Sequence, residues 1–170
     1  ANPRAAARPA ADGARARAWK FIDHGDRHFR AGRYREALSR YRRAVDSSGD
    51  VADARFREGF AYLSLGSVER AALSIRRGLD RDPAWPDSAF VLDDLYPDEA
   101  ARDAAYKVLA DRLKDRPNDA DARFLAGVLL HFDGRPNEAE RQFRRVIKLA
   151  GDDAASRLFL SPEIAGGAGR

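Results

Sequence analysis

The side chains in this sequence that could carry out covalent chemistry show no spacing that points to a reaction. The chain has no cysteine, which excludes thiol nucleophiles, disulfides and thiolate metal sites. It has no G-x-S-x-G segment and no glycine-rich phosphate-binding loop. His24 and His28 stand four residues apart, a spacing compatible with a metal on one helix face, but His131 is far away in the sequence. We expect packing roles for His24 and His28, no metal, no cofactor and no enzymatic activity.

The charged side chains suggest binding instead of catalysis. The net charge is +4 and the pI is about 9.7, a balance that invites a nucleic-acid partner. Three of these four net charges belong to residues 1–17, where Asp12 alone opposes four arginines: Arg4, Arg8, Arg15 and Arg17. We expect this alanine- and arginine-rich segment to be a flexible basic arm.

Arginine pairs recur in phase at 42–43, 76–77 and 144–145. A stripe of this kind suits phosphate or an anionic polymer. Acids such as Glu36, Glu69 and Glu140 are interleaved with it, and no nucleic-acid-binding motif accompanies it. We therefore favour a solvated outer face and expect no nucleic acid as partner. No run approaches the roughly 18 apolar residues of a membrane span, so we expect none.

An internal repeat positions these side chains. Its period is 34 residues, and alanine recurs at one phase, at positions 37, 71, 105 and 139. A bulky residue recurs four positions later in each unit: Tyr41, Ile75, Leu109 and Phe143. The units are 18–51, 52–85, 86–119 and 120–153, and each has the apolar spacing of two amphipathic helices. One helix pair cannot bury its apolar face alone, so the pattern predicts an all-α solenoid of stacked units.

Small residues at further phases predict where helices touch and where they end. Gly59 is expected to let the two helices of its unit approach closely, with Ala71 doing the same on the opposing helix. Gly66 is expected to separate those helices. Asp82-Pro83 is expected to end the second one, because proline disfavours helix in the residue before it.

The pattern resembles the tetratricopeptide repeat family, and the four units cover residues 18–153. The matching residues are Gly25, Gly32, Tyr34, Ala37, Tyr41 and Ala44 in the first unit, Gly59, Tyr62, Gly66, Ala71, Ile75 and Pro83 in the second, and Gly127, Gly134, Ala139 and Phe143 in the fourth. The resemblance implies a right-handed superhelix of four antiparallel helix pairs with a concave groove. It also implies the binding of protein or peptide without any enzymatic activity.

The third unit departs from the family pattern. Pro97 directly follows Tyr96, so we expect the first helix of this unit to end early. We expect its second helix to start near Asp98, which can cap it, and to run to about Asp115. The irregularity is either a local widening of the groove or tolerated drift in one repeat, and we favour drift.

In this family the groove is lined by the exposed face of the first helix of each unit. Carried over onto this sequence, that face combines aromatic and carboxylate side chains and contains no lysine. Aromatic residues are typical of binding hot spots, and carboxylates select a basic partner. The candidate partner-binding residues are Trp19, Asp26, Phe29, Asp53, Phe56, Phe60, Phe90, Asp94, Phe124, His131 and Phe132.

Several of these positions also have a purely structural explanation. Asp53 lies in the first turn of its helix, where a carboxylate complements the helix dipole whatever the ligand, and we favour that role. Phe56, Phe90 and Phe124 are as consistent with packing between units as with a ligand contact. In chaperone-binding members, groove lysines and asparagines grip the terminal carboxylate of a peptide. The corresponding slots here hold Ile22, Asp26, Phe56 and Phe60, so we do not expect that mode of binding.

Residues 154–160 are expected to begin a capping helix in which Leu158 and Phe159 cover the last repeat, and a flexible glycine-rich tail is expected to follow to residue 170.

The leading functional hypothesis is a scaffold whose groove binds a protein or peptide.

The alternative is a self-assembling subunit of a homopolymer or filament, in which the arm 1–17 or the repeat ends contact the neighbouring copy. A third, weaker hypothesis is a regulatory domain of a larger enzyme. The sequence does not begin with methionine. We therefore expect a processed or trimmed start, which fits a cytoplasmic and an exported protein equally.

Overall fold

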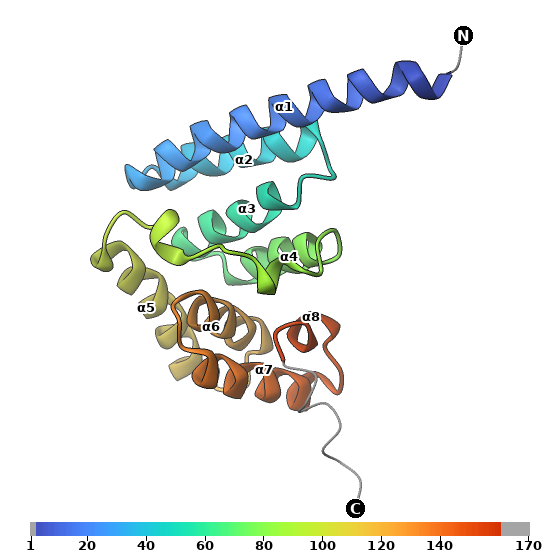
Figure 1. Ribbon diagram of the computed structural model, residues 1–170. Helices are drawn as coiled ribbons and strands as arrows, with labels where there is room; N and C mark the ends of the chain where they lie inside the picture. The colour runs from blue at the N-terminus through green and yellow to red at the C-terminus, as the bar shows by residue number, and fades with distance from the viewer. Residues whose placement is uncertain (1–2, 161–170) are drawn as a thin grey trace, which may run out of the picture. The chain divides into compact units, whose positions relative to one another are not determined.

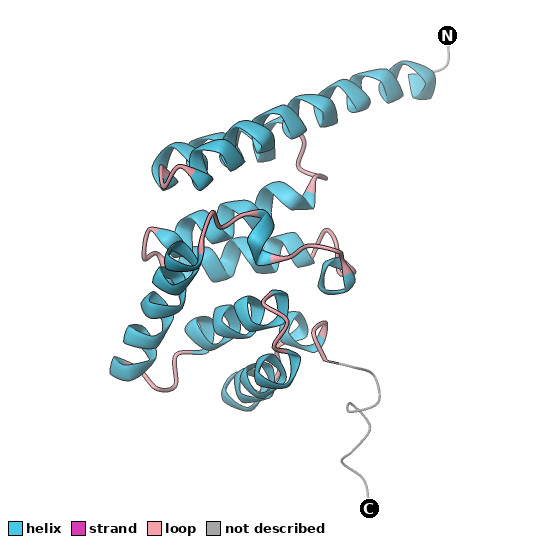
Figure 2. Ribbon diagram, turned by 60° about the vertical axis from the view of Figure 1, so that its left-hand side comes forward, coloured by secondary structure: helices cyan, strands magenta, loops and turns pink. Residues whose placement is uncertain are grey.

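The computed structural model describes the backbone of residues 3–160 and the side chains of residues 10–160, and every regular element in that range is a helix (Figures 1 and 2). The predicted all-α class is confirmed. No helix of this described part combines the length and the apolar character needed to cross a bilayer. The elements are α1 (Pro3–Arg30), α2 (Tyr34–Ser47), α3 (Ala52–Ser64), α4 (Val68–Leu79), the 3-10 helices η1 (Trp85–Asp87) and η2 (Leu92–Asp94), α5 (Glu99–Asp115), α6 (Ala120–Phe132), α7 (Pro136–Ala150) and α8 (Ala154–Arg157).

The chain divides into two compact units, the first ending at Asp82 and the second beginning at Pro83. The first unit consists of two helical hairpins, α1–α2 and α3–α4, and α2 also packs against α3. Each hairpin turns at a glycine with positive φ, 70° at Gly32 and 77° at Gly66. Glycine adopts this left-handed conformation without steric cost, which is why the helices end there as the sequence predicts.

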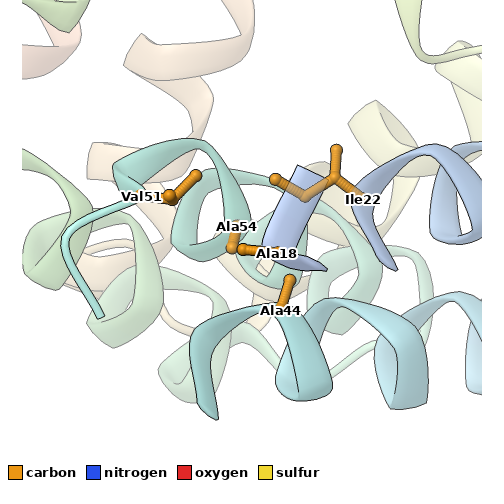
Figure 3. Close-up of a cluster of buried hydrophobic side chains, with 5 residues drawn as sticks. All are labelled: Ala18, Ile22, Ala44, Val51 and Ala54. Atoms are coloured by element: carbon orange, nitrogen blue, oxygen red, sulfur yellow. The ribbon is translucent and has the colours of Figure 1, made fainter. Parts of the chain in front are cut away.

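The interface between the two hairpins of the first unit is built from small side chains. Ala18 and Ile22 of α1 meet Ala44 of α2, and Val51 and Ala54 complete the cluster at the start of α3 (Figure 3). All five are buried. Because three of them are alanine, the helices approach closely without leaving a void.

The part of α1 before Ala18 extends past this core. α1 has 28 residues and α2 has 14, and residues 10–17 are exposed or half-exposed. Figure 1 shows this half of α1 running beyond α2. The flexible arm predicted for residues 1–17 is therefore helical from Pro3 onward. Alanine and arginine are strong helix formers, and the packed second half of α1 provides a helix on which these residues continue.

Glycines at one phase of the repeat allow paired helices to touch. A Cβ on Gly59 would lie 2.7 Å from Cδ1 of Ile75 and 3.1 Å from the carbonyl oxygen of Ala71. A Cβ on Gly127 would lie 2.7 Å from a ring carbon of Phe143. No side chain fits at such distances, so the close approach predicted from Gly59 and Ala71 is confirmed.

The second unit contains one complete helix pair, α6–α7, with α5 packed on α6 and α8 on α7. Asp98 caps α5 by accepting the amide N–H of Ala101 at 2.8 Å. α5 then runs from Glu99 to Asp115, as the sequence predicts. Asp119 caps α6 in the same way, accepting the amide of Ala122 at 2.9 Å.

The first half of the third repeat contains no α-helix, so the prediction of a shortened first helix is wrong. Only η1 and η2 form there, with extended backbone at Ser88 and Val91. Pro86 and Pro97 remove two backbone donors that a helix would use, and Trp85 is drawn into a cluster on α6, where it is only 4% exposed. Tertiary packing outweighs the repeat pattern here. α5 alone therefore represents the third of the four predicted helix pairs, and the superhelical handedness stays a prediction.

The last repeat is capped as predicted, although the capping helix is short. Asp153 begins α8 by accepting the amide of Ser156 at 2.9 Å. The ring of Phe159 stacks on that of Phe143 with centroids 4.5 Å apart. Leu158 is 40% exposed, so Phe159 provides the cover. The predicted glycine-rich tail lies outside the described residues.

Candidate functional site

Two ion pairs align α1 with α3 in the first unit. Arg15 of α1 donates from Nε to Oδ2 of Asp50, just before α3, at 2.7 Å. Further along, Arg57 of α3 donates from Nε to both carboxylate oxygens of Asp26 on α1, at 3.0 and 3.1 Å. The Arg15 and Asp50 side chains are about half exposed, whereas those of Arg57 and Asp26 are 16% and 15% exposed. The Arg57–Asp26 pair therefore joins α3 directly to α1, and the more exposed Arg15–Asp50 pair joins α1 to the residues before α3.

We call three accessible residues beside these ion pairs the α1/α3 strip: Trp19 and Asp23 of α1, and Asp53 of α3. Trp19 falls one turn after Arg15 and two turns before Asp26, so it lies on the same side of α1. Its side chain is 42% exposed. Asp23 is exposed and the Asp53 side chain is 40% exposed. Trp19 and Asp53, two residues predicted to line a groove, are therefore both accessible.

Asp26, which was predicted to contact a basic partner, is instead the centre of a polar network within the first unit. Besides the Arg57 bonds, its Oδ1 accepts the hydroxyl of Tyr41 at 2.8 Å. Arg57 also donates from NH1 to Oδ1 of Asp53 at 3.0 Å. Two carboxylates therefore share one guanidinium, and Asp26 has little charge left for a ligand. Asp53 keeps Oδ2 without a bond to the described residues.

The network shifts the proton affinities of its members. Burial raises the pKa of the Tyr41 phenol far above its usual value, and the Asp26 carboxylate adds to the effect. Burial alone would lower the pKa of Arg57, but the carboxylates of Asp26 and Asp53 outweigh it and raise that pKa. Tyr41 is therefore a neutral donor and Arg57 a cation at neutral pH.

Five of the predicted groove phenylalanines are core residues, and this part of the prediction is corrected. Their side chains are only 0 to 6% exposed, so no ligand reaches them in this conformation; they are Phe29, Phe56, Phe60, Phe124 and Phe132. Phe56 lies against Gly78 of α4, and Phe124 packs edge-on to Phe143. A bulky ring at these phases fills the space between helices, where a smaller residue would leave a cavity.

In the second unit, the chain itself covers the face of α6 that was predicted to bind a ligand. Trp85 packs on Phe132 with ring centroids 4.4 Å apart, and Phe90 packs edge-on to the same ring at 5.1 Å. His131 donates from Nε2 to the carbonyl oxygen of Pro86 at 2.7 Å. His131 and Phe90 are half-buried and Asp94 is exposed. The residues predicted here therefore contribute mostly to internal packing.

The arginines predicted to form a self-association arm differ in their surroundings. The side chains of Arg4 and Arg8 lie outside the described residues. Arg17 is exposed, whereas Arg15 is engaged by Asp50. The Ser48 hydroxyl and then Arg15 lower the pKa of Asp50, so this exposed pair is fully ionised near neutral pH.

The two histidines of α1 are not core residues. His24 is exposed, so the packing role predicted for it is wrong. His28 is half-buried and accepts a hydrogen bond at Nδ1 from Nε of Arg33 at 3.0 Å. Within the described residues, no group of histidine and carboxylate side chains is arranged to hold a metal ion.

Comparison with known families agrees with the repeat pattern. Two family models described as tetratricopeptide repeat match this chain, one over residues 22–89 and the other over residues 120–153. Together they span more than half of the sequence. The chain belongs to the tetratricopeptide repeat family. The two matches leave residues 90–119 between them, which contain η2 and α5, where the tetratricopeptide repeat is irregular.

Solved structures, two of them of tetratricopeptide repeat domains, are similar at low identity. The first such domain of Spaghetti (RPAP3), bound to the HSP90 peptide SRMEEVD, is 14% identical with a TM-score of 0.43, over 84% of this chain and 86% of that one. The second domain of human RPAP3, in complex with the HSP70 peptide SGPTIEEVD, is 19% identical with a TM-score of 0.44, over 86% and 94%. MamA from MSR-1 is 28% identical with a TM-score of 0.36, over 79% and 78%. No curated protein sequence matches the chain.

Sequence reasoning missed Arg57 and Trp85, which organise the two units. Arg57 stands four residues after Asp53, a spacing at which side chains meet on a helix, so the Asp53 contact had a local signal. The Asp26 contact spans 31 residues and had none. Trp85 lies at the boundary between two repeats, where the tetratricopeptide repeat pattern assigns it no role.

Proposed function

We propose that this chain is a non-enzymatic scaffold that binds a protein or peptide partner through the α1/α3 strip of its first unit. The observation that carries the proposal is Trp19, an indole that is 42% exposed beside two ion pairs. A tryptophan on a rigid helix offers a large contact area at small entropic cost, and tryptophan is among the commonest hot-spot residues. Membership in a family of protein-interaction repeats supports the same function.

The charges of the strip indicate the chemistry of the partner. Asp23 is an exposed carboxylate, and Asp53 is 40% exposed although it is bonded to Arg57, whereas Asp26 is only 15% exposed and bonded to both Arg57 and Tyr41. A partner that places an apolar side chain on Trp19 and an arginine or lysine beside it finds a carboxylate within reach. We therefore expect a short segment that combines basic and apolar residues.

The proposal is tested by selecting peptides from a display library on the full chain and titrating the best binder. The chain has two tryptophans, and Trp85 is only 4% exposed. A change in fluorescence on binding therefore reports mainly on Trp19. We expect enriched peptides to contain a basic residue next to an apolar one. We expect Trp19→Ala to weaken their binding by about 1 to 3 kcal/mol, or roughly 5- to 150-fold.

A matched control is Leu158→Ala, which truncates another exposed apolar side chain in the second unit. It is expected to leave the affinity unchanged. Equal affinities of the selected peptides for Trp19→Ala and for the unaltered chain would show that the strip is not the contact surface.

A second candidate function is self-assembly through the first half of α1. The observation that favours it is that residues 10–17 extend past the core with no buried side chain. An uncovered helix segment of one copy is available to contact a second copy, and a head-to-tail contact of this kind propagates unless it closes into a ring.

Sedimentation velocity over a concentration series separates the two functions. We compare the full chain with one that lacks residues 1–17. If the full chain forms large species and the shortened chain stays monomeric, the first half of α1 drives assembly. If both are monomeric at every concentration, self-assembly is excluded and the binding of another protein stays the leading function.

A further inference from the structure

The first unit has a second charged surface, on the opposite side of α3 from the strip. Arg55, Glu58 and Tyr62 lie about half a helical turn away from Asp53 and Arg57. Two adjoining hollows, of about 640 and 260 Å³, open over this side between α2, α3 and α4. Four of the residues that line them are arginines, and we call these the arginine hollow: Arg42, Arg55, Arg77 and Arg81.

The four arginines differ in how they are held. Arg55 donates from NH1 to Oε2 of Glu58 at 3.0 Å, and the Ser74 hydroxyl donates to the same oxygen at 3.0 Å. Glu58 is only 5% exposed, so this anchor fixes Arg55 in place. Arg42 and Arg77 are exposed and make no hydrogen bond or ion pair within the described residues. They retain their donors for a ligand.

The equivalent arginines of the last repeat are already engaged. Arg144 donates from Nε to Oε1 of Glu140 at 2.6 Å, and Arg145 donates from NH2 to Oδ1 of Asn118 at 3.1 Å. α2 and α4 differ from α7 in composition as well, because each of them carries two more arginines than carboxylates. The solvated outer face favoured from the sequence stays a prediction.

We propose that the arginine hollow binds an acidic segment of a protein partner, and that Arg42 and Arg77 take its carboxylates. A guanidinium binds a carboxylate through two parallel hydrogen bonds, which gives both affinity and geometry. Val45 and Tyr62 line the hollow as well, and offer apolar surface to the methylene groups of a glutamate. Asp46 and Asp80 stand among the arginines. They repel the phosphates of a nucleic acid, whose spacing is fixed along the strand, whereas the flexible side chains of a glutamate peptide can turn away from them.

The inference is independent of the α1/α3 strip, because the two surfaces share no residue. The test measures the binding of a fluorescently labelled hexaglutamate peptide to the full chain by anisotropy. We expect saturable binding that weakens as salt is added. We expect R42E/R77E to weaken it by at least about tenfold, since two charge-assisted contacts are lost. Circular dichroism checks that the helices are intact.

The matched control is R116E/R141E, which makes the same change in net charge at two exposed arginines of the second unit. It is expected to change the affinity by less than about twofold. W19A is expected to bind hexaglutamate as the unaltered chain does, so a failure of the strip and a failure of the hollow are distinguishable.

Three results overturn the inference. One is the absence of saturable hexaglutamate binding to the unaltered chain. Another is an equal loss of affinity in R42E/R77E and R116E/R141E, which would reduce the effect to net charge. The third is competition by inorganic phosphate or by a DNA duplex at concentrations as low as those of unlabelled hexaglutamate, which would make the hollow a general anion site.

Discussion

The two units are built from the same repeat, but the first leaves one face of its helices exposed and the second covers the corresponding face. In the first unit, α1 and α3 leave an accessible strip with Trp19 42% exposed. In the second unit, the corresponding face of α6 is covered by the chain's own residues, and Trp85 is only 4% exposed. The difference arises where the third repeat fails to form its first helix. A repeat that loses a helix can therefore close the surface that its neighbour would offer to a partner.

The interactions behind the two faces also differ. The first unit relies on a network in which Arg57 bridges Asp26 and Asp53. The second relies on aromatic rings, with Phe132 between Trp85 and Phe90. Apolar packing excludes a ligand, whereas a partly exposed ion network leaves donors and acceptors near solvent. On this face, the second unit therefore buries its aromatic rings, and the first leaves charged and aromatic side chains accessible.

The largest expected effect sharpens this contrast between the two tryptophans. Trp85→Ala removes a buried indole and should lower the free energy of unfolding by about 3 to 5 kcal/mol. Trp19→Ala removes an exposed one and should change it by less than about 1 kcal/mol. Urea denaturation followed by circular dichroism measures both. Similar losses in the two variants would mean that Trp85 is not the core of the second unit.

A smaller effect is expected within the ion network of the first unit. Asp26→Ala leaves Arg57 buried without its main partner and Tyr41 without an acceptor, and should lower the free energy of unfolding by about 2 to 3 kcal/mol. Asp53→Ala should lower it by less than about 1 kcal/mol, because the Asp53 side chain is 40% exposed. Urea denaturation of both variants tests the ranking, and a larger loss for Asp53→Ala would contradict it.

Both units contain a glycine at which two paired helices touch, and replacing it should destabilise each unit to a similar extent. Gly59→Ala and Gly127→Ala force a Cβ against Ile75 and Phe143 respectively. Each should lower the melting temperature, at a cost of about 1 to 3 kcal/mol. Gly49→Ala is the control, since nothing lies within 4 Å of its added Cβ and its φ is not in the left-handed region. A tolerated Gly59→Ala would show that the helices of the first unit separate easily.

The smallest effect is a pH dependence in the second unit. Partial burial alone would raise the pKa of Asp119, but the Ala122 amide and the Arg112 guanidinium outweigh it and hold that pKa below its usual value. A carboxylate with a lowered pKa stabilises the fold above its unfolded pKa, near pH 4, and this contribution is lost as the pH falls through the folded pKa.

Asp119→Asn keeps a capping side chain but loses the ion pair with Arg112. It should therefore lower the free energy of unfolding by less than about 1 kcal/mol at neutral pH, and the deficit should shrink as the pH falls below about 4. Urea denaturation at a series of pH values measures this. A deficit that stays constant down to acidic pH would mean that the Asp119 charge contributes nothing.

Features with local causes could be predicted from the sequence. The turn at Gly66, the Asp98 cap and the length of α5 each depend on residues a few positions apart, and each is found in the structure. The close approach at Gly59 follows from side-chain size alone. The family follows from the repeat pattern.

The candidate site could be predicted only in part. Trp19 and Asp53, which the spacing placed on an exposed helix face, are accessible in the structure. The spacing assigned Phe56 and Phe124 equally to the core and to a ligand, and both are buried. Periodicity identifies a face without saying which neighbour covers it, and the neighbour decides whether a ring is buried.

The sequence by itself determined the all-α class, the repeat and most helix ends, because these follow from periodic apolar positions and local capping. Only the tertiary structure decided which surfaces are open. The pairing of Arg57 with Asp26 joins residues 31 positions apart, and the contact of Trp85 with Phe132 requires a segment that abandons the helix its repeat predicts. Both depend on the packing of whole helices, since burying a large ring or a polar network outweighs the preference of a short segment for helix.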